Sequence, residues 1–236
     1  MGTQTRRSMR KLFLYMVILA LCGCEVIKEE DRLIHMDAVE GERVHVLLEF
    51  TGFRCVNCPT AAELANALSE LYDEQLVVVA LHPASNPFTQ GKYDYTCPGA
   101  DSIYTWMGGT ASTSFPKGNV DMRLMEGEYL HDASEWATMV YEAMKETTVP
   151  SLANAEVSYW LVEDSVLGVQ AMPDGSVNMH YYHRHLLRDI QTNKADIAIP
   201  SDADTARLSL LTIYTDKNDN HILNAYETTI DFGLNH

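Results

Sequence analysis

Two short apolar runs in the first half of the chain predict buried parallel strands. The first lies within residues 44–50 and the second within 75–82, and valine and leucine fill most positions of both. Runs this short, apolar on both faces, are typical of strands inside a parallel sheet. Between them, alanine and leucine recur at helical spacing from Pro59 to Tyr72, which predicts a helix. Strand, helix and parallel strand would form a right-handed βαβ unit.

The pattern continues with further α/β elements up to about residue 149. It predicts a long loop over 83–99, a short helix over 100–107, a strand over 119–124 and a helix that opens at 131–135. In that last helix, Asp132 followed three residues later by Glu135 predicts a capping box. Loops as long as the first of these are often functional in compact domains.

From about residue 150 the apolar positions alternate instead of recurring at helical spacing. The predicted strands span 156–163, 177–185, 207–215 and 222–232. A run of strands after an α/β half predicts a smaller antiparallel sheet or β-sandwich. We therefore expect an α/β domain over 40–149 and a β-rich domain over 150–236.

The N-terminal residues predict a targeting segment. Four basic residues precede the apolar run Leu12–Gly23, which is shorter than the ~20 residues that a spanning helix needs. The run ends in Leu-Cys-Gly-Cys24, which looks like a lipobox, so we expect a signal peptide over 1–23 and a lipidated Cys24 that anchors the chain in the membrane. An ordinary secretory peptide cut nearby is the alternative. Residues 24–39 would then be an acidic tether.

The composition is acidic, with a formal net charge of −16. Removing the basic targeting segment would make it more negative still. Such a surface should not bind nucleic acid or anionic lipid through its charge. The stretch Glu25–Asp31 resembles a lysine-plus-acid signal for display on the cell surface, which leaves both the periplasm-facing and the surface-facing orientation open.

Cys55 and Cys58 carry the candidate chemistry. They follow the first apolar strand and precede a helix, which is the layout of a thioredoxin-type redox site. The thiolate is the reactive form of cysteine, and a helix N-terminus favours negative charge. The competing hypothesis is half of a zinc site, but the remaining candidate ligands, Cys97 and His82, are isolated. We therefore expect no metal and no cofactor.

The number of cysteines limits which disulfides can form. With Cys24 consumed by lipid, three thiols remain, and they cannot all pair within one chain. Because disulfides persist outside the cytoplasm, we expect a Cys55–Cys58 bridge, with Cys97 either free or an alternative partner in exchange.

Two further residues are candidate members of the site. Glu49 lies six residues before Cys55, where thioredoxins carry a buried acid. An acid inside a buried strand is costly without a function or a partner, and a salt-bridged or edge-facing glutamate is the alternative. In thioredoxin-like folds a cis-proline precedes the strand expected here over 119–124, and this proline faces the cysteine pair. Pro116 matches that position. A trans-proline turn is the alternative. His82 either assists as acid and base or only opens the following loop.

Two histidine and aspartate patterns resemble metal sites without a complete ligand set. His183 and His185 would share a strand face, but no carboxylate at matching spacing completes the set. Residues 216–220 approach a calcium loop, yet the position that needs glycine is His221, so a polar hairpin turn is the better interpretation.

Three segments of the chain resemble the outer-membrane-protein-twenty-eight family of lipoproteins. They are Leu-Leu-Glu-Phe-Thr-Gly-Phe-Arg-Cys-Val-Asn-Cys-Pro59, residues 159–164 and residues 183–188. Its members pair a thioredoxin-like N-terminal half with a β-rich C-terminal half. The stretch 148–157 looks short for the family, so a strand of the second half would be missing. The resemblance implies an outer-membrane location, facing the periplasm or the cell surface, more firmly than it implies an activity.

Two functions follow as hypotheses. In the first, the chain is a thiol-disulfide oxidoreductase acting on a thiol or disulfide of a protein or peptide. Cys55 would exchange, Cys58 would resolve the mixed disulfide, Glu49 would aid proton movement and Pro116 would orient the substrate. In the second, the thioredoxin-like half is a non-catalytic scaffold with a static disulfide, and the lipoprotein binds a surface partner.

Overall fold

The computed structural model describes residues 43–230, so the expected signal peptide over 1–23 and tether over 24–39, with Cys24, lie outside the described residues. The described elements are β1 (His45–Phe50), α3 (Cys58–Tyr72), η1 (Asp73–Gln75), β2 (Leu76–Leu81), α4 (Pro98–Trp106), β3 (Lys117–Val120), α5 (Ala133–Met144), β4 (Ala155–Glu163), β5 (Val166–Ala171), β6 (Val177–His183), β7 (Leu186–Gln191), η2 (Lys194–Asp196), η3 (Thr205–Arg207), β8 (Leu208–Asp216) and β9 (Ile222–Thr229). No helix within residues 43–230 is long and apolar enough to cross a membrane.

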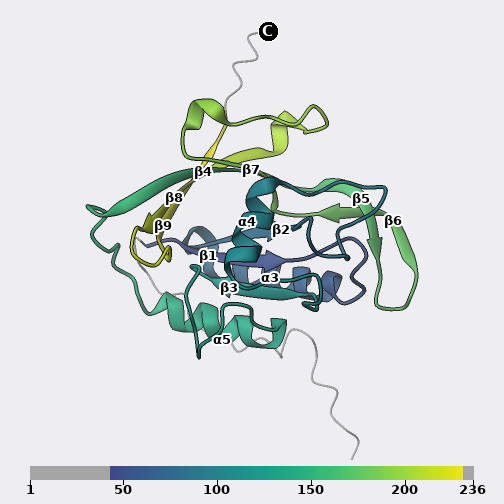
Figure 1. The fold of residues 1–236 in the computed structure, drawn as a ribbon, viewed down its shortest axis with the longest axis horizontal. Coiled ribbons are helices and arrows are strands. Elements are labelled where there is room, and N and C mark those ends of the chain that lie inside the picture. The colour runs from purple at the N-terminus through teal and green to yellow at the C-terminus, as the bar shows by residue number, and fades with distance from the viewer. Residues whose placement is uncertain (1–42, 231–236) are drawn as a thin grey trace, which may run out of the picture. The chain divides into compact units, whose positions relative to one another are not determined.

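The described part is a mixed α/β protein. Seven strands form one sheet in the order β3-β1-β2-β7-β4-β8-β9, and β5 and β6 form a separate two-stranded sheet (Figure 1). The predicted strands over 44–50 and 75–82 and the predicted helix over 59–72 are confirmed to within two residues at each end. The β1–β2 pair is parallel, as the βαβ pattern predicted.

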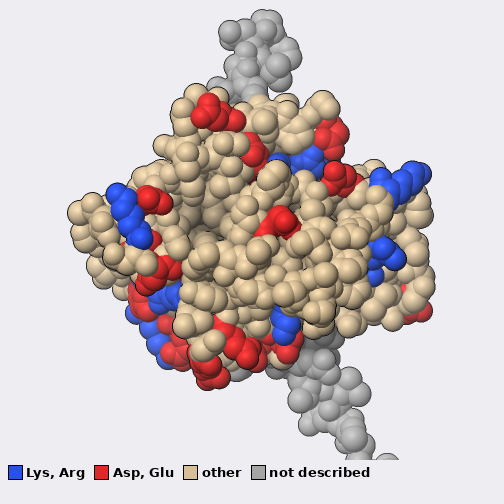
Figure 2. All heavy atoms as spheres, in the orientation of Figure 1, with Lys and Arg blue, Asp and Glu red and all other residues tan. Residues whose placement is uncertain are grey.

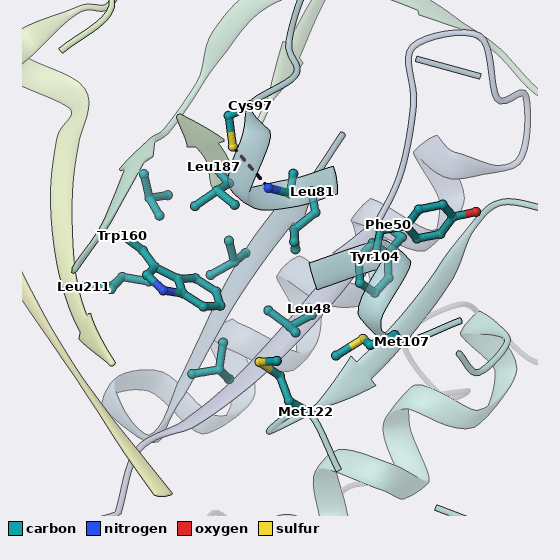
Figure 3. Close-up of a cluster of buried hydrophobic side chains, with 14 of the residues drawn as sticks. Leu48, Phe50, Leu81, Cys97, Tyr104, Met107, Met122, Trp160, Leu187 and Leu211 are labelled. Carbon is teal, nitrogen blue, oxygen red and sulfur yellow. Dashed lines mark hydrogen bonds between the residues drawn. The ribbon is translucent and has the colours of Figure 1, made fainter. Parts of the chain in front are cut away.

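Strand β1 lies between β2 and β3 and carries apolar side chains on both faces. Val46, Leu48 and Phe50 belong to a buried cluster that includes Tyr104 of α4, whose ring centroid lies 5.4 Å from that of Phe50 (Figure 3). The alternating residue Glu49 instead shares a cavity with residues of α3. Helices α3 and α4 therefore pack on opposite faces of β1.

The strands after residue 150 continue the same sheet. Strand β7 pairs in parallel with β2 through Leu186 and Ala80, and β4, β8 and β9 follow in antiparallel register. Trp160 of β4 and Leu211 of β8 lie in the same buried cluster as Leu48 (Figure 3). The strands on both sides of the expected boundary at 149/150 thus share a sheet and a core, while the division into two domains stays a prediction.

Two local predictions before residue 150 were wrong. Strand β3 ends at Val120 rather than at 124, because Asp121 and Met122 adopt positive φ angles of 57° and 56°. The capping box does not form. Asp132 holds the N-cap position of α5 without a capping hydrogen bond, and its carboxylate pairs with Lys117 Nζ at 2.8 Å.

The strand pattern after residue 150 was also incomplete. Strands β5 and β7 were not predicted, and the strand expected over 177–185 ends at His183. His185 has a φ of 53°, which turns the chain into β7, so His183 and His185 do not share a strand face. The hairpin expected around 216–220 forms between β8 and β9, and Asp216 Oδ1 accepts a hydrogen bond from Asn218 N at 2.8 Å.

Candidate redox site

The cysteine pair lies where the central strand passes into a helix. Cys55 and Cys58 form a disulfide with Cα atoms 5.4 Å apart. Cys55 N donates to Gly52 O at 3.0 Å in the turn after β1, and Cys58 is the first residue of α3. Pro59 follows within the first helical turn, where a backbone N–H has no helical acceptor to lose. The arrangement brings two sulfurs to the carboxyl end of a buried strand.

Cys97 is a free, buried thiol at the N-cap of α4. Its Sγ accepts a hydrogen bond from Ala100 N at 3.4 Å. Burial is the main reason why the pKa of this thiol is raised above its usual value. A neutral thiol is a poor nucleophile, so Cys97 is less reactive than an exposed cysteine would be.

Pro116 lies at the same edge of the sheet as the cysteine loop. The Phe115–Pro116 peptide bond is cis, as the position before this strand predicted. Lys117, the next residue, pairs with Phe50, the last residue of β1. Phe88 links the two segments, because its ring centroid lies 5.9 Å from that of Phe115 and its carbonyl accepts from Arg54 N at 3.0 Å.

Glu49 is a buried acid on the α3 side of β1. It is 3 % exposed and lines a cavity of about 20 Å³ together with Cys58 and His82. That volume has room for about one water molecule. Burial raises the pKa of Glu49 to about 8, although a hydrogen bond from the Thr51 side chain acts in the opposite direction. The carboxyl group therefore holds its proton at neutral pH.

Two neutral histidines line the same cavity. The ring centroids of His82 and His183 are 5.6 Å apart. Burial lowers the pKa of His82 well below its usual value, and it lowers that of His183 to about 4. His183 Nε2 donates to Val169 O at 3.2 Å, whereas neither ring nitrogen of His82 has a hydrogen-bond partner within the described residues. Neither ring can stabilise a thiolate as a cation at neutral pH.

Gln170 is a site residue that the sequence pattern did not reveal. Its Nε2 donates to Cys55 O at 2.8 Å, and the next residue, Ala171, donates its backbone N–H to Phe53 O at 2.8 Å. These contacts bring β5, from the second half of the chain, against the cysteine loop. Cys55 is only 2 % exposed and Cys58 only 1 %. A glutamine inside a strand carries no local signal of such a role, since only the tertiary fold brings the two segments together.

A larger cavity lies between α4 and the strands β4, β7 and β8. It has a volume of about 490 Å³, within the range of ligand pockets, and Figure 2 shows the corresponding hollow in an uncharged part of this face. Its lining includes Trp106, Met122 and Trp160 but no titratable side chain. No group of three or more metal-ligating side chains that could hold an ion occurs within residues 43–230.

Comparison with known proteins supports a fold but no family. No protein-family model and no curated protein matches the chain. A solved structure, HBP35 of Porphyromonas gingivalis, is similar with a TM-score of 0.57 at 15 % identity, covering 82 % of this chain and 77 % of that one. A structural-genomics protein from Agrobacterium tumefaciens has a TM-score of 0.48 at 12 % identity, covering 84 % of this chain and all of the other. At these identities the likeness to HBP35 concerns the fold alone.

Proposed function

We propose that this chain exchanges thiols and disulfides through Cys55 and Cys58 on a thioredoxin-like core. The observation that carries the proposal is a bonded cysteine pair at the carboxyl end of β1, where Cys58 shares a cavity with the buried acid Glu49 and the residue after cis-Pro116 pairs with the last residue of β1. The strand order supports the thioredoxin-like assignment, because β1 is flanked by parallel β2 and antiparallel β3 and is followed by the cysteine-bearing helix.

The exchange takes two displacement steps. A substrate thiolate attacks Cys55 Sγ, forming a mixed disulfide while the Cys55–Cys58 bond breaks and Cys58 leaves as a thiolate. A second substrate thiolate then attacks the substrate sulfur of the mixed disulfide and releases Cys55 as a thiolate. The substrate is oxidised to a disulfide, and the protein gains two electrons and, after protonation, two thiols. The same steps in reverse reduce a substrate disulfide.

Glu49 would be the proton donor for the buried Cys58 sulfur. It shares its cavity with Cys58, and with a pKa of about 8 it holds a proton that it can pass to the leaving Cys58 thiolate. In the reverse direction the carboxylate takes that proton back. Pro116 would present backbone groups beside the cysteines to an extended peptide substrate.

Trapping of the mixed disulfide tests the proposal. In a Cys58→Ser chain, Cys55 cannot be released by its partner, so substrate proteins should stay attached to it in cell envelopes. They should appear as higher-mass bands on non-reducing gels and disappear on reduction. Cys55→Ser is the matched control and should trap far less. Equal or absent trapping in both variants would count against exchange through Cys55.

The location is proposed from the sequence. The lipobox-like Leu-Cys-Gly-Cys24 and the resemblance to the outer-membrane-protein-twenty-eight lipoproteins support a chain that is lipid-anchored in the outer membrane. Radiolabelled palmitate should then enter the wild-type chain and not a Cys24→Ser variant. Labelling of both variants, or of neither, would contradict the anchor.

One observation favours the scaffold function. Both sulfurs are almost fully buried, and a disulfide that no thiolate can reach is a structural link rather than a reagent. In that case the cysteine pair stays oxidised in the folded protein at every physiological ratio of thiol to disulfide.

A further inference from the structure

The β5–β6 hairpin is structurally separate from the main sheet. Within the described residues, β5 and β6 pair with each other and with no strand of the seven-stranded sheet. Figure 1 shows the hairpin (green) beside the sheet rather than within it. A movement of the hairpin would therefore break no hydrogen-bonded ladder of the main sheet.

Both ends of the hairpin have the backbone conformation of sharp turns. Ser165, just before β5, has a φ of 56°, and His185, just after β6, has a φ of 53°. Non-glycine residues are uncommon in this region of backbone space. Asp164 joins the two ends, because its carboxylate accepts from Ser165 Oγ at 2.6 Å and from His185 N at 3.3 Å. Changes of φ and ψ at a few such terminal positions are how hinged elements move.

The hairpin touches the cysteine loop through a small set of contacts. The Gln170 amide donates to Cys55 O at 2.8 Å and lies 3.4 Å from Gly52 O, and Ala171 N donates to Phe53 O at 2.8 Å. These contacts hold β5 against the segment that carries the first cysteine. The hairpin also supplies Gln170, Tyr181 and His183 to the cavity that Cys58 lines, so it lies beside the buried disulfide. The rate of exchange depends on access to the attacked sulfur.

A second contact closes the hairpin against the long loop before α4. Tyr95 Oη accepts from Val169 N at 3.3 Å. Gly168 leaves the space for this contact, because a Cβ atom there would overlap Tyr95 Oη and approach the His183 ring to 3.1 Å. A Cβ atom at this position therefore requires the Tyr95 ring or the hairpin to shift, and either movement disturbs the contact between the hairpin and the loop.

We propose that the β5–β6 hairpin is a flap that regulates access to the Cys55–Cys58 disulfide, with Gln170 as its latch. In the closed position the disulfide is shielded from thiols, and exchange occurs after the hairpin swings about Ser165 and His185. The inference rests on the proposed thiol-disulfide exchange, since a flap over an inert disulfide would regulate nothing. It also accounts for a reactive pair that is nearly inaccessible in the closed structure.

The rate of disulfide reduction tests the flap. The oxidised full chain is mixed with excess dithiothreitol under native conditions, and the free Cys55 and Cys58 thiols are counted over time by alkylation and mass spectrometry. Gln170→Met keeps the shape but removes the amide donor, and Gly168→Ala obstructs closure by a different route. Gln191→Met, in the main sheet, is the matched control.

The flap predicts that Gln170→Met and Gly168→Ala are each reduced about tenfold faster than wild type, consistent with the loss of roughly one strong hydrogen bond. The Gln191→Met rate should stay within about twofold of wild type. Far-UV circular dichroism must show that each variant is folded. If a variant does not fold, the test is instead the hydrogen exchange of the Ala171 amide in the wild-type protein. We expect this amide to exchange through a local opening whose free energy is lower than that of global unfolding.

The outcomes separate the two levels of the proposal. Equal reduction rates in all four proteins, or Ala171 exchange only through global unfolding, would overturn the flap and leave thiol exchange standing. If dithiothreitol reduces the disulfide in none of the folded variants, thiol exchange itself would be overturned, and the flap with it.

Discussion

At the scale of single residues, burial keeps the carboxyl group of Glu49 protonated at neutral pH. In water a glutamate is ionised at neutral pH, but removal from solvent penalises the charge. The two histidines that line the cavity do not offset that penalty, because burial keeps both His82 and His183 neutral. The result is a protonated acid that lines the same cavity as Cys58, and the proposed exchange would use its proton when Cys58 leaves as a thiolate.

Substituting Glu49 tests this protonation state. Its pKa rises from 4.5 in the unfolded chain to about 8 in the folded one. Between these values the folded state binds more protons than the unfolded state, so the free energy of unfolding falls as pH rises, by up to about 1.4 kcal/mol per pH unit. Glu49→Gln removes this contribution. We expect the variant to gain stability relative to oxidised wild type progressively from pH 5 to pH 8, as measured by urea unfolding. A difference that does not change with pH would contradict a raised pKa.

Single residues also mark what the sequence could and could not predict. Cys55, Cys58 and Glu49 belong to one continuous stretch whose strand, turn and helix are set by local pattern, so their arrangement was accessible from sequence. Gln170 lies more than a hundred positions away and reaches Cys55 through the tertiary fold. The capping box failed for a similar reason, because Lys117 from another element takes the Asp132 carboxylate.

At the scale of elements, the passage from β1 into the cysteine loop depends on a close backbone approach. A Cβ atom on Gly52 would lie 2.6 Å from Phe88 O, a backbone atom that cannot rotate away. The loop that carries Phe88 therefore fixes the path of the chain toward Cys55. The long loop over 83–99 therefore packs against the cysteine loop, and its function stays a prediction.

Gly52→Ala should displace one of the two segments. We expect a loss of unfolding free energy of about 1–3 kcal/mol, the usual cost of overpacking a rigid contact, measured by urea unfolding of the oxidised protein. Because Cys55 N and the Gln170 amide both lie against Gly52 O, the variant should also be reduced faster by dithiothreitol. A variant with wild-type stability and reduction rate would show that the approach is not tight.

The elements that were not predicted have a common physical origin. Strand β5 contains Gly168, a shift in register and the buried polar Gln170, so it lacks the alternation that identifies a half-exposed strand. Strand β7 was missed, and the predicted β6 strand ran too far, because the turn at His185 uses a non-glycine residue with positive φ. Turns of that kind are not marked by the glycine and proline signals on which sequence interpretation relies.

At the scale of the whole described unit, the two halves of the chain are joined by buried polar contacts as well as by the sheet. Asp121, after β3, accepts from Val46 N at 2.9 Å and contacts His45 Nδ1 at 2.6 Å, while its carbonyl accepts from Ile222 N at 2.7 Å. One residue thus ties β1 to β9. Breaking such a buried network is costly, so the halves should not separate easily.

Unfolding should consequently be a single cooperative transition for residues on both sides of 149. Trp136 in α5 and Trp160 in β4 report on the two halves. Trp→Phe substitution at the other two of the three tryptophans leaves either one as the sole tryptophan, whose fluorescence is excited selectively. Within each variant, the fluorescence and far-UV circular dichroism midpoints in urea should coincide. Separate midpoints would instead support two independently folding domains.

The central claim is that Cys55 and Cys58 form a redox pair in the folded protein, and its most direct test is a redox titration. The full chain is equilibrated with defined ratios of reduced and oxidised glutathione, and the two thiols are quantified by alkylation while far-UV circular dichroism monitors the fold. We predict reversible conversion within about −270 to −120 mV, the interval of known thiol oxidoreductases, with no loss of secondary structure. A pair that stays oxidised throughout, or that is reduced only when the chain unfolds, would contradict the account.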